Sequence, residues 1–278
     1  MTKSYPTLRL KNQIISLQKP IVMGILNATP DSFYEGSRTK TEKDILQKAS
    51  QMLEEGTTIL DIGGYSTRPD ADDISIDEEI KRVVPTIETI KKEFPKAIIS
   101  IDTFRSEVAK KAVEAGADLI NDVSGGSLDK KMFETVADLK VPYILMHMRG
   151  TPQTMKTLTD YENIMAEIMT YFQERVLKLK SLGVNDVILD LGFGFAKTIE
   201  QNYFLLKNLS IFHHLELPIL VGVSRKSMIY KRLDISAFEA LNGTSVLNTV
   251  AIQNGAKILR VHDVKEAVQA IQLLEYLK

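Results

Sequence analysis

The stretch Gly24-Ile25-Leu26-Asn27-Ala28-Thr29-Pro30-Asp31-Ser32-Phe33 begins inside an apolar run that starts at Ile21. The run is typical of a buried strand. It ends abruptly in Asn, Thr and Asp, so oxygens and an amide lie where the chain leaves the core. Such a strand end can hold a metal or a phosphate. The same residues also make a good surface turn, and the stretch alone leaves both interpretations open.

Seven more short apolar runs follow along the chain. They alternate with amphipathic segments of helical periodicity, most of which end in a glycine or proline. The eight runs are Ile21–Leu26, Thr58–Ile62, Ala97–Ile101, Leu119–Ile120, Tyr143–Met146, Val187–Leu189, Ile219–Val223 and Ile258–Val261.

Eight strands and eight helices in alternation fit either a doubly wound open sheet or a (β/α)8 TIM barrel. A barrel of this kind takes about 250 residues, and the chain has 278. We therefore expect an α/β fold with one barrel domain over residues 1–278. The barrel itself would span about 20–278, and a short N-terminal β-hairpin at about 7–18 would cover its bottom.

Composition excludes several classes of protein. A formal net charge of −1 gives no electrostatic footprint for nucleic acid or a membrane surface. The absence of cysteine removes disulfides, thiol catalysis and zinc-thiolate sites. No apolar stretch reaches the roughly 20 residues of a spanning helix, and Met1 to Lys19 contains no signal peptide core. We expect a cytoplasmic protein.

The carboxyl ends of barrel strands converge on one face, and here all eight deliver polar groups to it. The two longest segments expected to be unstructured, Pro30–Thr41 and Tyr65–Ile76, follow strands and lie on the same face. Long loops in a compact domain are more often functional than idle.

Two groups of residues at this face have a chemical interpretation. One group could surround a polyanion, with Mg²⁺ bridging Asn27 to its phosphate oxygens. Its members are Asn27, Thr67, Arg68, Arg260 and His262. A flat heterocycle with donor and acceptor edges would suit Asp102, Asn121, Asp190 and Lys226. Phe195 and the Arg260 guanidinium plane can stack on such a ring. Ordinary structural roles compete with this interpretation for Asp122 and Asp263 as helix caps and for His147 as a buried hydrogen-bonded side chain.

At these residues the chain resembles dihydropteroate synthase, the folate-pathway family of pterin-binding TIM barrels, from about Ile21 to Val264. The first motif is the opening stretch. The others are Asp61–Pro69, Ser100–Thr103, Ile120–Val123, Leu145–Met148, Gly192–Phe195, Val223–Ser227 and Arg260–Val264. Such enzymes are Mg²⁺-dependent and usually homodimeric transferases. They join 6-hydroxymethyl-7,8-dihydropterin diphosphate to 4-aminobenzoate, and sulfonamides inhibit them competitively.

The resemblance implies a role for each matching residue. Catalysis would involve Asp102, Lys226, Arg68 and Asp190. The pterin would contact Asp102, Asn121, Met146, Asp190, Phe195, Lys226 and Arg260. The diphosphate would contact Asn27, Thr67, Arg68, Arg260 and His262, with Asn27 as the metal ligand. The aminobenzoate would contact Phe33, Thr67, Pro69, Phe195 and Ser227.

A dissociative substitution fits these roles. Loss of diphosphate leaves a cation on the pterin, which anionic Asp102 and Asp190 would stabilise. Mg²⁺, Arg68, Arg260 and His262 would stabilise the departing diphosphate.

The chain departs from the family pattern at Tyr65, Asp70, Leu191 and Ala196, where an acidic residue, glycine, proline and glycine are usual. None of these departures removes an expected ligand. Two alternatives remain: a methyltransferase domain that binds methyltetrahydrofolate, and a catalytically silent paralogue that binds pterin.

Overall fold

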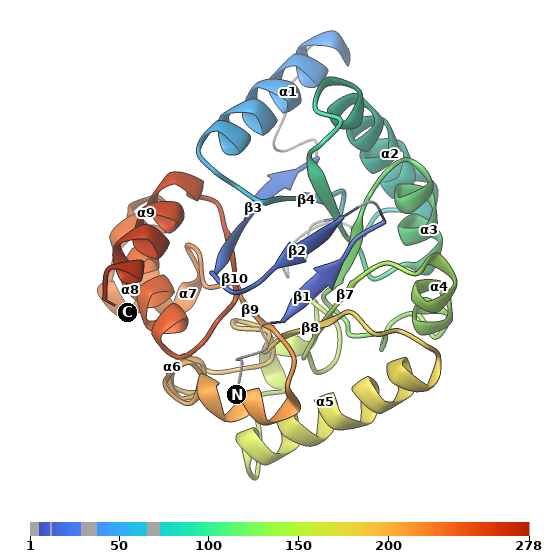
Figure 1. The fold of residues 1–278 in the computed structure, drawn as a ribbon. Helices are drawn as coiled ribbons and strands as arrows, with labels where there is room; N and C mark the ends of the chain where they lie inside the picture. Colours follow the sequence, from blue (N-terminus) through green and yellow to red (C-terminus); the bar gives the residue numbers. More distant parts are fainter. Residues whose placement is uncertain (1–5, 12, 29–37, 66–72, 278) are drawn as a thin grey trace.

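Alternating apolar and helical segments fold into a closed barrel of eight parallel strands in the computed structural model, which describes residues 6–11, 13–28, 38–65 and 73–277. The strand order around the barrel is β10-β3-β4-β5-β6-β7-β8-β9. Helices surround the strands (Figure 1). The predicted TIM barrel is confirmed.

Each barrel strand is short and ends near a polar residue. The strands are β3 (Ile21–Asn27), β4 (Ile59–Gly63), β5 (Ile98–Asp102), β6 (Leu119–Asp122), β7 (Tyr143–Met146), β8 (Val187–Asp190), β9 (Ile219–Val221) and β10 (Ile258–Val261).

The α-helices pack outside the strands. They are α1 (Arg38–Glu54), α2 (Ile76–Glu93), α3 (Ser106–Glu114), α4 (Met132–Leu139), α5 (Ile164–Ser181), α6 (Ile199–Lys207), α7 (Ser227–Leu233), α8 (Leu241–Gln253) and α9 (Val264–Glu275). Three 3-10 helices lie between them: η2 (Met155–Thr157), η3 (Leu209–Leu215) and η4 (Ala237–Glu239).

Two sequence-based expectations about helices were wrong. In the part of the chain that the structure describes, both α7 and α8 lie between β9 and β10, so the helices number nine rather than eight. Helix α1 begins at Arg38, inside the segment Pro30–Thr41 that was expected to lack regular structure. Its first turn has no apolar periodicity, and its first buried apolar side chain is Ile45, so a pattern of buried positions could not detect where it starts.

The prediction that glycines follow the ends of several helices is confirmed. Gly56, Gly116, Gly183 and Gly255 all have positive φ values between 86° and 119°. Only glycine adopts this backbone conformation without strain, and each of the four lies between a helix and the next strand.

A layer of apolar side chains fills the bottom of the barrel. Every strand contributes one buried residue to it: Met23, Ile59, Ile98, Leu119, Ile144, Ile188, Leu220 and Ile258. Three buried leucines from the N-terminal segment, Leu8, Leu10 and Leu17, belong to the same cluster. This segment forms an antiparallel hairpin of β1 (Thr7–Arg9) and β2 (Ile14–Ser16), which crosses the end of the barrel (Figure 1). The predicted hairpin and its position are confirmed.

The hairpin should stabilise the barrel through these leucines. We expect Leu17→Ala to lower the free energy of unfolding by about 2–5 kcal/mol, because it leaves a cavity in a fully buried layer. Ile14→Ala is the matched control, since Ile14 lies in the same hairpin and is 70% exposed; its effect should stay within about 0.5 kcal/mol. Urea denaturation measures both, and equal effects would contradict a plug at the bottom of the barrel.

Candidate active site

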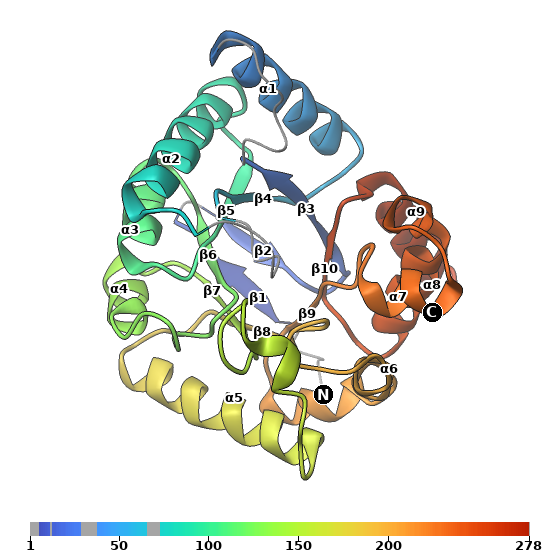
Figure 2. The same ribbon diagram turned by 180° about the vertical axis from the view of Figure 1, so that it is seen from behind.

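Polar side chains replace apolar ones two residues further along five of the eight strands. Because side chains alternate between the two faces of a strand, residues two positions beyond the apolar layer also point into the barrel. These residues are Ile25, Asp61, Ser100, Asn121, Met146, Asp190, Gly222 and Arg260. The interior therefore changes from apolar to polar over one layer, and Figure 2 views the barrel from the side opposite the hairpin.

Arg260 is the centre of the largest polar network in this layer. Its Nε donates to Asp61 Oδ2 at 2.6 Å, and its NH2 donates to Asp102 Oδ2 at 2.6 Å. Asn121 Nδ2 also donates to Asp61 Oδ2, at 3.1 Å. Four strands, β4, β5, β6 and β10, are thus linked through one guanidinium and one carboxylate.

Asp61 is a site residue that sequence reasoning did not select. Its side chain is fully buried, and its Oδ1 has no hydrogen-bond partner among the described residues. Ser100 on the adjacent strand is equally buried, and its Oγ also lacks a partner in that part of the chain. The sequence analysis included Asp61 in the motif Asp61–Pro69 without giving it a role, and the structure places it in the middle of β4 rather than at its end. The signal was a carboxylate inside an apolar run, which is costly to bury without a cation.

Burial perturbs both carboxylates that were expected to contact a heterocycle. Desolvation raises the pKa of Asp102 to about 7, although the charge of Arg260 opposes the shift. Desolvation also raises the pKa of Asp190, against the charge of Lys226 and a hydrogen bond from the Gly192 N–H. Burial therefore works against the anionic form of Asp102, and the ion pair with Arg260 works in its favour.

Lys226 and Phe195 lie together beside β8. Lys226 Nζ donates to the Phe193 carbonyl and lies 4.7 Å from the centre of the Phe195 ring. Burial lowers the pKa of Lys226 to about 8, while Asp190 raises it. Met146 is buried in an apolar cluster against which Phe195 packs. The structure therefore brings three of the residues expected to contact a pterin to one wall of the mouth.

His262 and Ser224 lie at the rim. Ser224 Oγ and His262 Nδ1 are 3.0 Å apart. Desolvation, together with the charge of Arg260, lowers the pKa of His262 to about 4. His262 is therefore neutral at pH 7 and would hydrogen-bond to an anion rather than offer it a charge.

Asn27 ends β3 with an exposed side chain. It pairs in register with Gly63, which pairs in turn with Asp102. A Cβ placed on Gly63 would lie 3.8 Å from Asn27 Oδ1 and 3.8 Å from Asp102 Oδ2. Both oxygens thus border space that a side chain at position 63 would fill. Ser227 begins α7 directly after Lys226, as expected.

Four expected site residues lie outside the described part of the chain. They are Phe33, Thr67, Arg68 and Pro69. The described site is consequently the part formed by the strand ends and by the turns after β8 and β9.

The expected helix-cap role was wrong for Asp122 and Asp263, whose side chains make no capping hydrogen bond, and the expected role as a buried, hydrogen-bonded side chain is confirmed for His147. Asp122 accepts hydrogen bonds from Ser124 N and Oγ, from Gly126 N and from the Tyr143 hydroxyl. Asp263 does not cap a helix; its carboxylate forms a two-point ion pair with Arg225, at 2.8 and 2.9 Å. His147 is buried, and its Nδ1 lies 3.0 Å from Lys197 Nζ.

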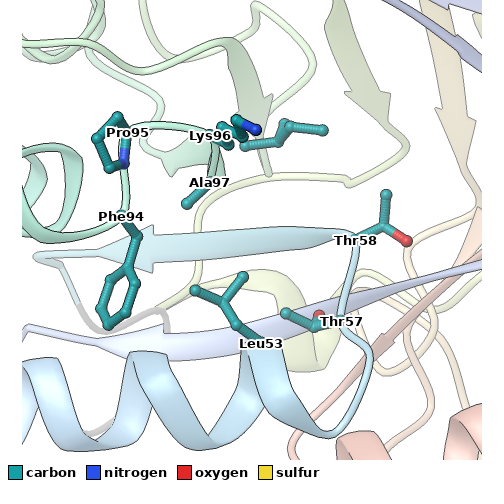
Figure 3. Close-up of a pocket in the computed structure, with 8 residues that line it drawn as sticks. Leu53, Thr57, Thr58, Phe94, Pro95, Lys96 and Ala97 are labelled. Carbon is teal, nitrogen blue, oxygen red and sulfur yellow. The ribbon is translucent and has the colours of Figure 1, made fainter.

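A pocket of about 460 Å³ lies elsewhere on the barrel. Leu53, Phe94, Ala97 and Ile98 give it a largely apolar lining at the start of β4 and β5, away from the polar strand ends (Figure 3). It contains none of the residues proposed from the sequence.

No cluster of three or more His, Cys, Asp or Glu side chains among the described residues is arranged to hold a metal ion. None of the helices in that part of the chain has the length and apolar character needed to cross a membrane.

Fold and site together define a (β/α)8 barrel with buried, hydrogen-bonded charged side chains at the carboxyl ends of its strands. Comparison with known families gives a match to the pterin binding enzymes over residues 23–262, and the chain belongs to this family. It is 42% identical to dihydropteroate synthase of Escherichia coli K12 over 263 residues, which cover 94% of this chain and 93% of that protein.

Solved structures agree with this assignment. Dihydropteroate synthase of Yersinia pestis in a sulfonamide drug complex has a TM-score of 0.90 at 41% identity, over 98% of this chain and 99% of that one. The Xanthomonas albilineans enzyme with 4-aminobenzoic acid has a TM-score of 0.91 at 36% identity, over 99% and 98%. The relatives are transferases, and the chain is an enzyme of their family.

The effect of Arg260 on the pKa of Asp102 can be tested directly. We expect Arg260→Gln to raise the pKa of Asp102 further above about 7, because the variant removes the opposing positive charge. Carbon-13 NMR titration of the aspartate carboxyl groups measures it. Arg225→Gln is the control, since Arg225 pairs with Asp263. An unchanged or lower pKa in Arg260→Gln would contradict the assigned network.

The raised pKa of Asp102 also determines the direction in which pH changes the free energy of unfolding. A carboxyl group whose pKa is higher in the folded than in the unfolded chain stabilises the fold fully below its ordinary value of 3.8. That contribution from Asp102 is lost as the pH rises through about 7.

Proposed function

We propose that the protein is a dihydropteroate synthase. It would condense 6-hydroxymethyl-7,8-dihydropterin diphosphate with 4-aminobenzoate and release diphosphate. The single observation that carries the proposal is the network in the mouth: Arg260, Asp61, Asp102 and Asn121 converge there from four strands. The names of the relatives support the same activity over 94% of the chain. They also disfavour a methyltransferase domain.

The pterin would lie between the strand ends and the turn after β8. Asn121 and Asp190 offer an amide and a carboxylate from neighbouring parts of the barrel, and both are almost fully buried. A carboxylate accepts two parallel N–H bonds from an aminopyrimidinone edge as it does from arginine. Arg260 would stack on the ring, and Lys226 would donate to its acceptor edge.

The substitution would be dissociative. Charge that develops on the pterin would be stabilised by Asp102 and Asp190. Because burial raises the pKa of both, their anionic forms depend on the neighbouring cations Arg260 and Lys226. A bound pterin cation would favour deprotonation of Asp102 further.

Mg²⁺ fits the described residues as a weakly held ion. The Asn27 amide oxygen is a hard, exposed ligand at the strand end. Magnesium is often bound by one or two protein oxygens together with substrate phosphates. The ion would supply positive charge to the leaving diphosphate. His262 and Arg260 would bind the same diphosphate, His262 through a hydrogen bond.

A homodimer and a cytoplasmic location stay proposals. Helices α7, α8 and α9 lie side by side (Figure 1) and carry exposed apolar side chains, including Leu233, Val246 and Leu273. Phe238 in η4 is 89% exposed. Side chains of this kind are enriched where proteins associate, and sedimentation analysis distinguishes a dimer from a monomer.

The central experiment is product formation. Purified protein with both substrates and Mg²⁺ should release diphosphate and form 7,8-dihydropteroate. The same reaction without 4-aminobenzoate distinguishes synthesis from hydrolysis. A protein that binds the pterin but forms no product would be the silent paralogue.

Asp190→Asn should abolish binding of the pterin diphosphate. The change replaces one acceptor oxygen by a donor that faces a donor on the ligand, and leaves both unpaired. Isothermal titration measures the loss. Asp138→Asn, an exposed aspartate on α4, is the control. Near-normal affinity of Asp190→Asn would refute the assigned pterin contact.

Asn27→Ala should raise the Mg²⁺ concentration needed for half-maximal turnover by about tenfold, the effect of losing one ligand worth about 1.4 kcal/mol. Turnover is measured across a Mg²⁺ titration, and EDTA should abolish it. Asn185→Ala, in an exposed turn before β8, should leave the titration unchanged. A metal titration that is identical for Asn27→Ala and the wild type would remove Asn27 as the ligand.

A further inference from the structure

The turn after β8, residues 192–196, has an unusually constrained backbone. Gly192, Gly194 and Ala196 have φ values of 67°, 81° and 47°. A Cβ on Gly192 would lie 2.1 Å from the His147 carbonyl oxygen, so the turn packs directly on the end of β7. Left-handed alanine is strained, so contacts elsewhere must hold the turn in place.

Lys197 provides those contacts from behind the turn. Its side chain is 8% exposed. Its Nζ lies 3.0 Å from the Gly192 carbonyl oxygen, 2.9 Å from the Phe195 carbonyl oxygen and 3.0 Å from His147 Nδ1. An ammonium group has three donors, and these are three acceptors. Within the described chain no carboxylate forms an ion pair with it.

The contact with Lys197 also bears on which tautomer the His147 ring adopts. Burial lowers the pKa of Lys197 to about 7, while the charge of Asp190 raises it. With Lys197 in its ammonium form, which only donates, His147 Nδ1 is the acceptor and the ring proton lies on Nε2. Burial and the charge of Lys197 lower the pKa of His147 well below its ordinary value, which agrees with a neutral ring. The ring packs edge-to-face on Tyr171, with centroids 4.7 Å apart.

The opposite side of the turn faces the candidate site. Lys226 Nζ donates to the Phe193 carbonyl and lies over the Phe195 ring. A Cβ on Gly194 would lie 3.2 Å from Lys226 Cδ. The turn thus lies between two lysines, and its position sets where Phe195 stands.

We propose that Lys197 is a positioning residue that holds the turn 192–196 and thereby places Phe195 against the aminobenzoate. This inference rests on the proposed function. Asp102 and Asn121 would reach the pterin from β5 and β6, outside the turn, and Asp190 stands on β8 with one hydrogen bond from the Gly192 N–H. Phe195, in contrast, belongs to the turn itself. Loss of the Lys197 contacts should therefore affect the aminobenzoate more than the pterin.

The test is Lys197→Met, which keeps the length of the side chain and removes its donors. We expect the KM for 4-aminobenzoate to rise by about tenfold or more, with kcat and the Kd for pterin diphosphate changed less than about threefold. Nitrogen-15 NMR should show His147 as the Nε2–H tautomer in the wild type and altered Nδ1 shifts in the variant. Lys207→Met, at an exposed position near the end of α6, is the matched control and should match the wild type.

Two outcomes of this experiment would contradict the role of Lys197. A folded Lys197→Met with a KM for 4-aminobenzoate within twofold of wild type overturns the inference, as does an equal loss in KM, kcat and pterin affinity. If Lys197→Met does not fold, Lys197→Gln, which retains an amide donor, is measured by the same criteria. A wild-type protein that forms no product refutes the proposed function and the inference with it, whereas an active wild type with an unaffected variant refutes the inference alone.

Discussion

The site depends on one constraint: Asp61 is a fully buried carboxylate inside the barrel and must be paired. Arg260 meets it with one nitrogen and reaches Asp102 with another. Removing either partner would leave an uncompensated charge in a dry interior, which is far more costly than losing an exposed pair. The geometry of the mouth is therefore rigid before any ligand arrives. The apolar layer one step below, closed by the hairpin, keeps water away from the bottom of this network.

Much of this organisation was predictable from the sequence. Strand positions followed from short apolar runs, and the barrel from their number and spacing. The polar mouth followed because the carboxyl ends of parallel strands must meet. The role of His147 as a buried, hydrogen-bonded side chain was also among the expectations.

What the sequence could not predict depends on packing in three dimensions. Asp61 and Arg260 are far apart in the sequence, so their contact depends on barrel closure between β10 and β3. The state of Asp102 depends on the depth of burial against one guanidinium, and no local pattern encodes that balance. The two helices between β9 and β10 were counted as one unit because a break between short helices has a weak signal. The sequence gives no sign that Lys197 is buried, because lysine side chains are mostly exposed.

The charges in the mouth bear on how a diphosphate is held. Among the described residues that converge there, the carboxylates Asp61, Asp102 and Asp190 oppose the cations Arg260 and Lys226, and His262 is neutral at pH 7. Arg260 is already shared by two carboxylates, and Lys226 donates to a carbonyl. The strand ends therefore lack the large excess of positive charge that would bind an anion without a metal ion or further cationic side chains. A diphosphate bound there needs further positive charge, and this physical requirement is an independent reason to propose Mg²⁺ at Asn27 and a contact from Arg68. It also explains how the mouth can suit the pterin: a balanced set of donors and acceptors binds a neutral heterocycle well, while the charge for the leaving group arrives with the substrate and its metal.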